Sequence, residues 1–168
     1  MKIRQATSKD SSLLSSLCVD VQSLHAEHYP DFFKIPQSDN FAVAFFDGML
    51  ADSTTSIFIA EENGQALGYV ICKLIERPEN LFKFSTRYLD VDQISVRPAA
   101  QGKGVGKALL IQVDALAREL NIQRIQLDSW GFNTTAHAFF EQMGFEKFNH
   151  RFWKKTLKTK SPILGLFV

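Results

Sequence analysis

Three glycines within five residues, Gly102, Gly104 and Gly106, make this stretch of the chain the one best suited to binding an anion. The residues before them, 89–96, are typical of a strand, and residues 107–120 have the spacing of an amphipathic helix. A glycine-rich loop between a strand and a helix leaves backbone N–H groups unpaired at the positive end of the helix dipole. We therefore expect phosphate binding, because glycines allow the backbone to approach a phosphate closely.

Two common phosphate-binding loops do not fit this stretch. A Walker A loop needs a glycine where Gln101 stands and a serine or threonine where Ala108 stands. A dinucleotide-binding fingerprint needs a third glycine at the position of Lys107. The stretch is therefore neither a P-loop nor a dinucleotide-binding motif.

The stretch instead resembles the acyl-CoA loop of the GNAT superfamily of N-acetyltransferases, which has the pattern Gln/Arg-x-x-Gly-x-Gly/Ala. Gln101, Gly104 and Gly106 match it. A second block, residues 133–145, is similar to the family's Asn-x-x-Ala-x-x-Phe-Tyr-x-x-x-Gly-Phe at every position except the tyrosine, where Phe140 stands. Two blocks in this order make the resemblance specific, whereas the loop alone would be a weak signal.

Length and composition favour one domain. The chain has 168 residues, 45% of them apolar, and a net charge of +1. We expect a single GNAT domain over residues 1–157 and an apolar C-terminal tail over 158–168. The small net charge gives no reason to expect a nucleic-acid partner, and we find no apolar run for a membrane span or signal peptide. Cys18 and Cys72 lie on apolar segments, which indicates buried thiols in a reducing, cytoplasmic compartment.

The hydrophobic pattern predicts alternating helices and strands. In chain order we expect a strand over 1–6, a helix capped within 7–10, a loop over 25–36, a short helix capped within 38–40, a hairpin of 56–61 and 65–75, a strand over 87–96, the helix 107–120, a strand over 124–130, a helix capped by Asn133 and ended by Gly144, and a last strand or hairpin over 145–157. This order predicts an α+β (α/β) fold with a mixed central sheet. The resemblance implies a GNAT-like three-layer αβα arrangement, with a V-shaped splay between the two central parallel strands.

The resemblance also implies acetyl-CoA as the cofactor and assigns residues to it. Loop amides would bind the pyrophosphate, the backbone of the preceding strand would bind the pantetheine, and the helix of the second block would lie beside both. A β-bulge in that strand would point one N–H at the thioester oxygen. The residues assigned to the cofactor are Ile94, Ser95, Val96, Gln101, Gly102, Lys103, Gly104, Val105, Gly106, Lys107, Asn133, Ala136, Phe139 and Phe140.

Two aspartates are candidates for the general base. Counted back from the loop, Asp90 falls at the position where the family often places an acidic residue, and Asp92 shares its face before any bulge. A free aspartate has a pKa of about 3.9, so burial must raise it or a water must relay the proton. The alternatives are that these residues pair with Arg87 or Arg97, or that a water chain alone removes the proton.

Phe140 is the clearest departure from the family, which often uses a tyrosine there as general acid. The leaving thiolate would then depart without that acid, or Tyr88, Ser129 or water would substitute. Phe140 itself is expected to pack against the pantetheine arm or the core. Catalysis through a cysteine nucleophile is not expected, because neither thiol has a neighbouring base in the sequence.

Aromatic residues beside a carboxylate suit an amine acceptor. The residues expected to line the acceptor site are His25, Glu27, Tyr29, Phe32, Phe33 and Trp130. The alternative for Phe32 and Phe33 is a place in the core. No metal site is expected, because His25 and His28 have no matching ligand pair elsewhere.

These observations predict an acetyl-CoA-dependent N-acetyltransferase. The acceptor would be a primary amine, on a small molecule, a peptide N-terminus or a lysine, attacking directly in a ternary complex. Two alternatives stay open, an enzyme using another short acyl-CoA and a CoA-binding sensor or interaction module without turnover. We expect a monomer or homodimer with no nucleic-acid or membrane partner.

Overall fold

One mixed sheet of five strands forms the centre of the computed structural model, which describes residues 1–154. The strands lie in the order of the chain: β1 (Lys2–Gln5), β2 (Thr55–Glu62), β3 (Gln65–Arg77), β4 (Thr86–Val96) and β5 (Ile125–Leu127). The first four are antiparallel, and β5 is parallel to β4. The predicted hairpin between β2 and β3 is confirmed, with Asn63 and Gly64 at positive φ in its turn.

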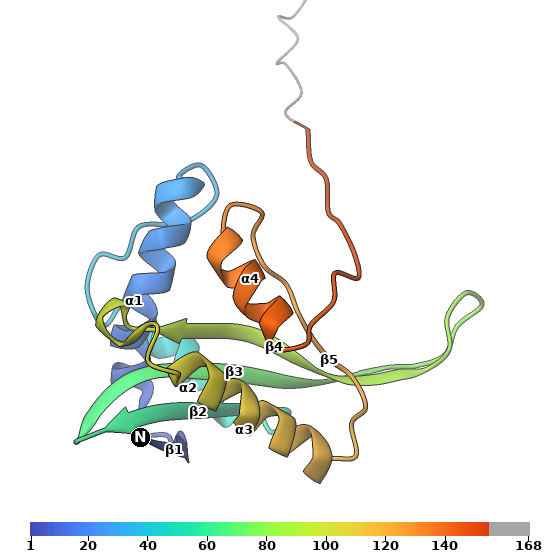
Figure 1. Ribbon diagram of the computed structural model, residues 1–168, viewed down its shortest axis with the longest axis horizontal. Coiled ribbons are helices and arrows are strands. Elements are labelled where there is room, and N and C mark those ends of the chain that lie inside the picture. The colour runs from blue at the N-terminus through green and yellow to red at the C-terminus, as the bar shows by residue number, and fades with distance from the viewer. Residues whose placement is uncertain (155–168) are drawn as a thin grey trace, which may run out of the picture.

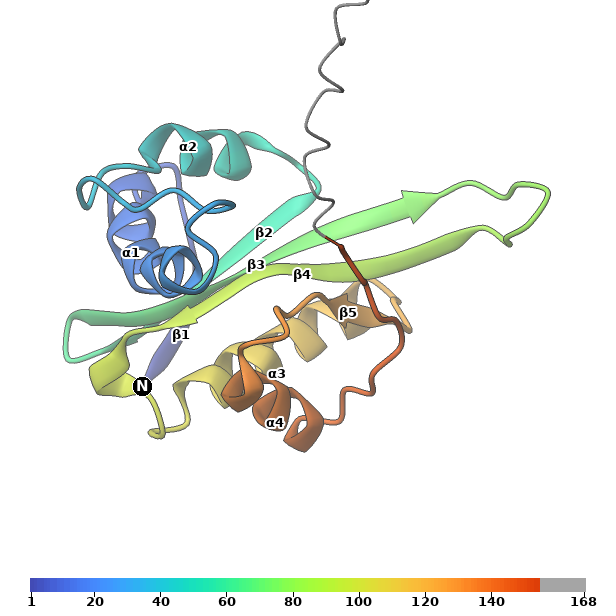
Figure 2. The ribbon, with the colours of Figure 1, turned by 90° about the horizontal axis from the view of Figure 1, so that it is seen from above.

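Helices cover both faces of the sheet. The four helices are α1 (Ser11–His28), α2 (Val43–Ala51), α3 (Val105–Glu119) and α4 (Thr134–Gln142). Figure 2 shows α1 and α2 above the sheet and α3 and α4 below it, so that each face carries its own apolar core (Figures 1 and 2). The expected mixed sheet in three αβα layers is confirmed.

The strands β4 and β5 are paired over only three residues each, Leu89–Val91 with Ile125–Leu127. Beyond Val91, the edge of β4 that faces β5 has no strand partner in the described part of the chain. This divergence is the expected splay, and it leaves the backbone of the second half of β4 open to a ligand.

A β-bulge at Asp92 reverses the faces of β4. On β3, Ile71 lies opposite Gln93 and Cys72 lies opposite Val91, which leaves Asp92 without a partner. Val91 packs in the core beneath α3, whereas Ser95, four residues on, is buried against α1. In a regular strand the side chains of residues 91 and 95 would point to the same face.

Both ends of α4 follow the sequence prediction. Asn133 caps the helix, because its Oδ1 accepts the backbone N–H of Ala136 at 3.1 Å. Gly144 has φ +88° and ends the helix, and the N–H of Phe145 donates to the carbonyl of Phe140 at 3.0 Å. This pattern of bonds is a Schellman motif.

The predicted loop over residues 25–36 was wrong in its first part. No glycine or proline interrupts the helical pattern before Pro30, so α1 continues through His28. His25 and Glu27 therefore lie on the last turns of a helix. The expected cap of α2 was wrong as well, because the helix begins at Val43 and no side chain caps it.

The two C-terminal strand predictions were too long. Residues 124–130 contain a strand of only three residues, β5. The described part of the predicted last strand, residues 145–154, contains no strand, because the Schellman motif turns Phe145 back onto α4. Residues 155–157 and the tail 158–168 lie outside the described residues.

Candidate active site

The glycine loop provides a row of free donors at the start of α3. Gly102 and Gly104 have φ of +72° and +82°, which glycine adopts without strain, and Gly104 is the residue before the helix. In the part of the chain that the structure describes, the amides of residues 102–107 have no hydrogen-bond acceptor. An anion held by these amides would also meet the positive end of the helix dipole.

Some side chains of the glycine loop anchor it to the rest of the fold, and others place positive charge at its surface. The Gln101 side-chain amide donates to the carbonyl of Val96 at 3.1 Å and thereby ties the loop to the end of β4. Val105 is buried in the core beneath α3. Lys103 and Lys107 are exposed, so both ammonium groups are available to a phosphate.

The second sequence block lies directly beside this loop. A Cβ atom on Gly106 would come within 3.1 Å of Cζ of Phe139, so α4 packs closely on the start of α3. Phe140 is 9% exposed and packs between Phe139 and Phe145. Ala136 packs against the same core from the first turn of α4. The structure thus brings the two blocks together, with Phe140 among the core residues.

The second half of β4 offers its backbone rather than its side chains. Ile94 and Val96 pack toward the core beneath α3, and the Ser95 hydroxyl donates to the carbonyl of Leu17 at 3.2 Å. One edge of this segment pairs with β3, and the other edge is the open one beside β5. A pantetheine arm could therefore hydrogen-bond there as an added strand.

The two candidate bases differ in their partners. Asp92 forms an ion pair with Lys73: the Nζ atom of Lys73 lies 3.0 Å from Oδ1 of Asp92. Asp90, on β4, lies directly opposite Lys73 on β3 and opposite Gln126 on β5. Burial raises the pKa of Asp90, and the charges of Asp92 and Asp128 raise it further. Asp90 is thus the carboxylate whose affinity for a proton is increased.

The alternative pairs expected for these aspartates do not form. Arg87 pairs with Glu76 at 2.7 Å, and Arg97 donates to the carbonyl of Ala66 and to the hydroxyl of Ser16. Lys73, which the sequence analysis did not consider, takes the role of the cation instead. Lys73 lies opposite Asp90 in the β3–β4 register, beside the bulged Asp92, and this placement follows from the register rather than from any local sequence pattern.

Three further residues that interact with the candidate site, Asp128, Tyr69 and Gln93, escaped the sequence analysis. Asp128 follows β5 and acts on Asp90 through its charge. Tyr69 donates its hydroxyl to Oε1 of Gln93, which also lies 3.6 Å from the Cys18 sulfur. This network ties the strand beyond the bulge to β3 and α1. No local pattern reveals it, since its members lie far apart in the sequence.

Both thiols are buried and favour their protonated form. Burial raises the pKa of Cys18 and raises that of Cys72 to about 12. Both cysteines are free and buried. Among residues 1–154, no three histidine, cysteine, aspartate or glutamate side chains are placed to share a metal ion. Within the same residues, no helix has both the length and the apolar character needed to cross a bilayer.

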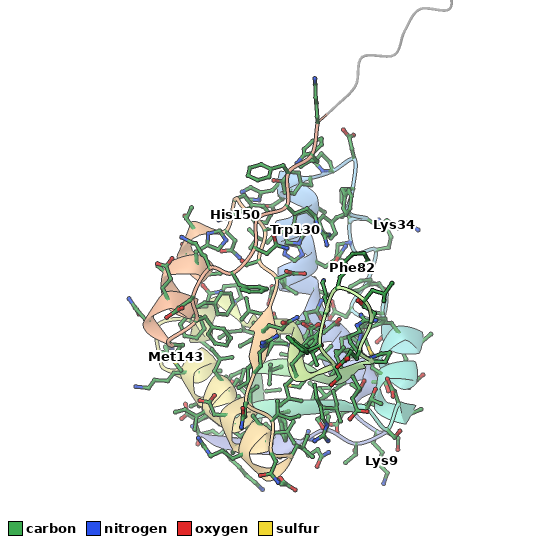
Figure 3. The ribbon with its side chains drawn as sticks, turned by 90° about the vertical axis from the view of Figure 1, so that its right-hand side faces the viewer. Lys9, Lys34, Phe82, Trp130, Met143 and His150 are labelled. Carbon is green, nitrogen blue, oxygen red and sulfur yellow. The ribbon has the colours of Figure 1, made fainter. Side chains whose placement is uncertain are left out.

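Five of the six predicted acceptor residues form one aromatic cluster. Trp130 lies beside the end of α1 (Figure 3), with ring centroids 4.9 Å from Phe33, 5.3 Å from Tyr29 and 5.4 Å from Phe32. His25 stacks on Phe33 at 4.9 Å. The cluster, named here the aromatic cluster, contains His25, His28, Tyr29, Phe32, Phe33, Trp130 and Phe132.

Two members of the aromatic cluster were missed, and one predicted residue stands apart. His28 stacks on Phe132 with centroids 4.0 Å apart. Burial lowers the pKa of His25, and the charge of His28 lowers it further, so His25 favours its neutral form. Glu27 is exposed on α1, and within the described residues it forms no hydrogen bond or ion pair.

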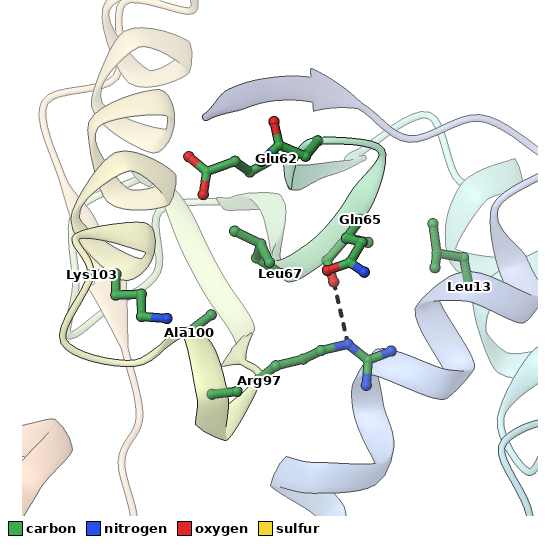
Figure 4. Close-up of a pocket in the computed structure, with 10 residues that line it drawn as sticks. Leu13, Glu62, Gln65, Leu67, Arg97, Ala100 and Lys103 are labelled. Atoms are coloured by element: carbon green, nitrogen blue, oxygen red, sulfur yellow. Dashed lines mark hydrogen bonds between the residues drawn. The ribbon is translucent and has the colours of Figure 1, made fainter.

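A hollow of about 570 Å³ lies on the other side of the glycine loop, beside the β2–β3 turn (Figure 4). Lys103 and Arg97 line it together with Glu62 and Leu67. It contains neither the carboxylates of β4 nor the aromatic cluster, so it is not the place where the acceptor would meet the open edge of β4.

Comparison with known protein families shows which family this glycine loop comes from. Residues 20–145 match the Acetyltransferase (GNAT) family. The chain belongs to this family. As a GNAT acetyltransferase it is an acetyl-CoA-dependent N-acetyltransferase, and the glycine loop, Asp90, Asp92 and the aromatic cluster all lie in the matched region.

Relatives in sequence are acetyltransferases of several kinds. This GNAT chain is 26% identical over 147 residues to the uncharacterized N-acetyltransferase YhfO of Bacillus subtilis (strain 168), a match that covers 88% of this chain and 91% of YhfO. It is 32% identical over 90 residues to the mycothiol acetyltransferase of Amycolatopsis mediterranei (strain U-32). That match covers 54% of this chain but only 30% of the mycothiol enzyme.

Solved structures share the fold. A tetramutant of the BH1408 protein from Bacillus halodurans has a TM-score of 0.88 at 18% identity, over 93% of this chain and 100% of that one. The aminoglycoside N-acetyltransferase AAC(6′)-Iy in complex with CoA has a TM-score of 0.70 at 18% identity, over 94% and 95% of the two chains. At these identities the structures show the fold and not the acceptor.

Proposed function

We propose that this GNAT chain transfers the acetyl group of acetyl-CoA directly to a primary amine, with Asp90 as the general base. The observation that carries the proposal is the placement of Asp90 on β4, beside the bulge and next to the open strand edge. The amides of residues 102–107 lie unpaired at the end of the same strand. The strand β4 would thereby position both acetyl-CoA and the general base.

The chain's own groups fit the donor. The amides of the glycine loop, with Lys103 and Lys107, would hold the pyrophosphate, and the backbone of residues 94–96 would hold the pantetheine. A Cβ on Gly104 would meet nothing within 4 Å, so the space above the loop is open to a ligand. The side-chain oxygen of Asn133 already caps α4, which leaves the side-chain NH₂ group of Asn133 for the cofactor.

Acetyl-CoA supplies a thioester whose carbonyl carbon accepts the amine nitrogen, while the thiolate leaves with the electron pair of the C–S bond. Asp90 takes one proton from the acceptor ammonium, which frees the nitrogen lone pair for attack, and the second proton, lost as the amide forms, passes to the leaving thiolate. A lysine-like ammonium has a pKa of about 10.4. The raised pKa of Asp90 therefore reduces the difference between the pKa of the base and that of the ammonium. Lys73 holds Asp92 in an ion pair and leaves Asp90 to act. Phe140 lies in the core and donates no proton.

The acceptor would reach Asp90 from the side of α1. Asp128, whose charge acts on Asp90, lies two residues before Trp130, so the segment that follows β5 links the carboxylates to the aromatic cluster. The carboxylates would attract the ammonium, and the rings would contact the apolar part of the same molecule. A small molecule, a peptide N-terminus and a lysine side chain all meet this description.

The test is to incubate the protein with acetyl-CoA and a pooled library of amines and peptides, and to identify acetylated products by mass spectrometry. We expect products that carry one acetyl group on a primary amine. No product, from protein that binds acetyl-CoA in calorimetry, would contradict the proposed reaction.

The two free cysteines fit a reducing compartment, and we propose a cytoplasmic location, which fractionation of the native host would check.

A further inference from the structure

A long arm projects from one end of the sheet (Figures 1 and 2). It consists of residues 74–88, which are the end of β3, a connecting loop and the start of β4. At its tip, Leu81 is 97% exposed, Phe82 is 92% exposed and Phe84 is 86% exposed. Single exposed apolar residues are common, but three adjacent ones at the end of a projecting element indicate an interaction site.

The tip is an ordered structure. The Oδ1 atom of Asn80 accepts the N–H groups of Phe82 and Lys83 at 2.8 and 3.1 Å, and the Asn80 N–H donates to the carbonyl of Lys83 at 3.0 Å. At the base of the arm, Arg87 pairs with Glu76 and donates to the carbonyl of Leu120. The apolar side chains are therefore presented on a preorganised turn, which lowers the entropy cost of binding.

The arm beyond the body is only two strands wide. The last backbone bond from β3 to the segment before β2 runs from the N–H of Leu74 to the carbonyl of Thr54 at 2.8 Å. From Ile75 to Arg77 the outer edge of β3 has no strand partner among the described residues. An isolated two-stranded ribbon is marginally stable in water, so a covering surface would stabilise it.

Three further exposed apolar side chains lie toward the other end of the molecule. The connection from α1 to α2 and the start of α2 expose Phe32 by 72%, Ile35 by 65% and Phe45 by 47%. Figure 2 shows α1, α2 and their connection toward the end of the sheet opposite the arm. We call the surface formed by Phe32, Ile35 and Phe45 the receiving surface.

We propose that two copies of this chain form a dimer in which the arm tip of each copy packs on the receiving surface of the other. Because the two surfaces lie at opposite ends of an elongated molecule, a twofold axis between two antiparallel copies brings both tips onto both receiving surfaces. The contact then closes in a dimer and leaves no unpaired end.

The size and charge of the contact fit this occupant. Two phenylalanines and a leucine bury roughly 500 Å² at each tip. With an equal area on each receiving surface the dimer buries roughly 2,000 Å², which is at the upper end of the usual range for a stable interface. Residues 27–45 contain three acidic side chains, Glu27, Asp31 and Asp39, and one basic side chain, Lys34, whereas the arm contains three basic side chains, Arg77, Lys83 and Arg87, and two acidic ones, Glu76 and Glu79. The two surfaces therefore carry opposite charge.

The dimer places the arm beside the aromatic cluster, because Phe32 of the receiving surface lies 5.4 Å from Trp130. This placement follows from the contact alone and does not depend on the acceptor. The interface can thus be tested whether or not the chain acetylates a given amine.

The first experiment measures mass in solution by light scattering and analytical ultracentrifugation over a range of concentrations. The unchanged protein is expected to be a dimer, and the double variant Phe82→Asp, Phe84→Asp and the variant Ile35→Asp are expected to be monomers. Phe148→Asp is the matched control, because Phe148 is 92% exposed outside both surfaces. It should remain a dimer, and circular dichroism should show all variants folded. A monomeric unchanged protein, or dimers that survive both substitutions, would overturn the proposal.

The second experiment identifies what the tip contacts. Cys18 and Cys72 are buried, so Lys83→Cys provides one reactive thiol at the exposed tip for a benzophenone maleimide. Irradiation is expected to yield a crosslinked dimer, with the adduct mapped by mass spectrometry to residues 29–45 of the other copy. Crosslinks between copies that avoid these residues, or crosslinks only within one copy, would show that the tip binds elsewhere.

Discussion

Asp90 and Asp92 have the same side chain but different surroundings, and the difference arises from one extra residue in β4. The bulge leaves Asp92 unpaired in the ladder, with Lys73 3.0 Å away, while Asp90 stays paired between β3 and β5. Burial and two neighbouring carboxylates raise the pKa of Asp90. A carboxylate in such an environment is a better proton acceptor at neutral pH than an exposed one.

This difference predicts opposite outcomes for two similar substitutions. Asp90→Asn should lower kcat by about 10²–10⁴-fold, the usual contribution of a general base. Asp92→Asn should keep activity but shift the acid limb of kcat/KM to lower pH, because it removes a like charge and frees Lys73 for Asp90. The pH profiles of both variants, with Asp114→Asn on α3 as control, check this. An inactive Asp92→Asn beside an active Asp90→Asn would assign the base to Asp92.

Asp10 stabilises the junction between β1 and α1. Its carboxylate accepts a hydrogen bond from each of two guanidinium nitrogens of Arg4, at 2.8 and 2.9 Å, and it also accepts the N–H and hydroxyl of Thr7. These bonds lower its pKa to about 2, with the Arg4 hydrogen bond as the largest cause. Because the folded pKa lies below the unfolded one, this stability is present above pH 4 and is lost as the pH falls toward 2.

Removing that charge should therefore destabilise the protein in a pH-dependent way. Asp10→Asn should lower the free energy of unfolding by about 2 kcal/mol at pH 7, the value that corresponds to the shift in pKa. Urea unfolding at pH 7 and at pH 2–3 measures it, and the difference between variant and unchanged protein should shrink at the lower pH. An equal difference at both pH values would mean that the ion pair contributes nothing.

Among the elements, α3 and the glycine loop before it contribute most of the proposed acetyl-CoA site. Its first turn contains no side-chain cap, so its free amides stay available to a ligand. Gly106 lets α4 approach to van der Waals contact through Phe139. Loop, α3 and α4 therefore form one rigid corner next to the open edge of β4.

Substitution of Gly104 should separate binding from folding. A Cβ there meets no atom within 4 Å, but φ is +82°, so Gly104→Ala adds backbone strain of roughly 1–2 kcal/mol. Gly104→Glu adds a negative charge beside the phosphate site as well and should abolish acetyl-CoA binding in calorimetry. Gly48→Ala on α2, where a Cβ also meets nothing, should bind normally. Unchanged affinity of Gly104→Glu would contradict the phosphate loop.

In the whole molecule, β4 connects the glycine loop to the layer that contains the aromatic cluster, which are the two proposed substrate sites. Its second half is tied to α1 by Ser95 and by the Gln93 network, and α1 ends in the aromatic cluster. Its end continues into the glycine loop. A ligand on β4 therefore braces both layers of the fold at once.

Acetyl-CoA should accordingly stabilise the folded protein. At a concentration 100 times Kd, binding to the native state alone adds about 2.7 kcal/mol. For a chain of this size that corresponds to a rise in Tm of roughly 5–10 °C. Differential scanning calorimetry with acetyl-CoA measures the rise, and free adenine is a suitable control ligand. An unchanged Tm at saturation would mean that acetyl-CoA does not bind the folded state.

Local chemistry in the chain was enough to predict most elements and to propose which of them would bind the acetyl donor. Period-2 and period-3.6 patterns place the hairpin and α3, Asn133 and Gly144 mark both ends of α4, and the glycine spacing identifies the loop. These features depend on residues close in sequence, so their physical causes are visible in a short window. The roles of individual site residues remain predictions.

Other features depend on residues far apart and became visible only in the folded chain. The bulge at Asp92 exists because β3 and β4 pair in two registers, and it decides that Lys73 meets Asp92 while Asp90 is left beside Asp128. The aromatic cluster forms because α1 continues past His25 to meet the segment after β5. No window of sequence contains both partners of such a contact, and their pKa values and exposures follow from the contact rather than from the residue type.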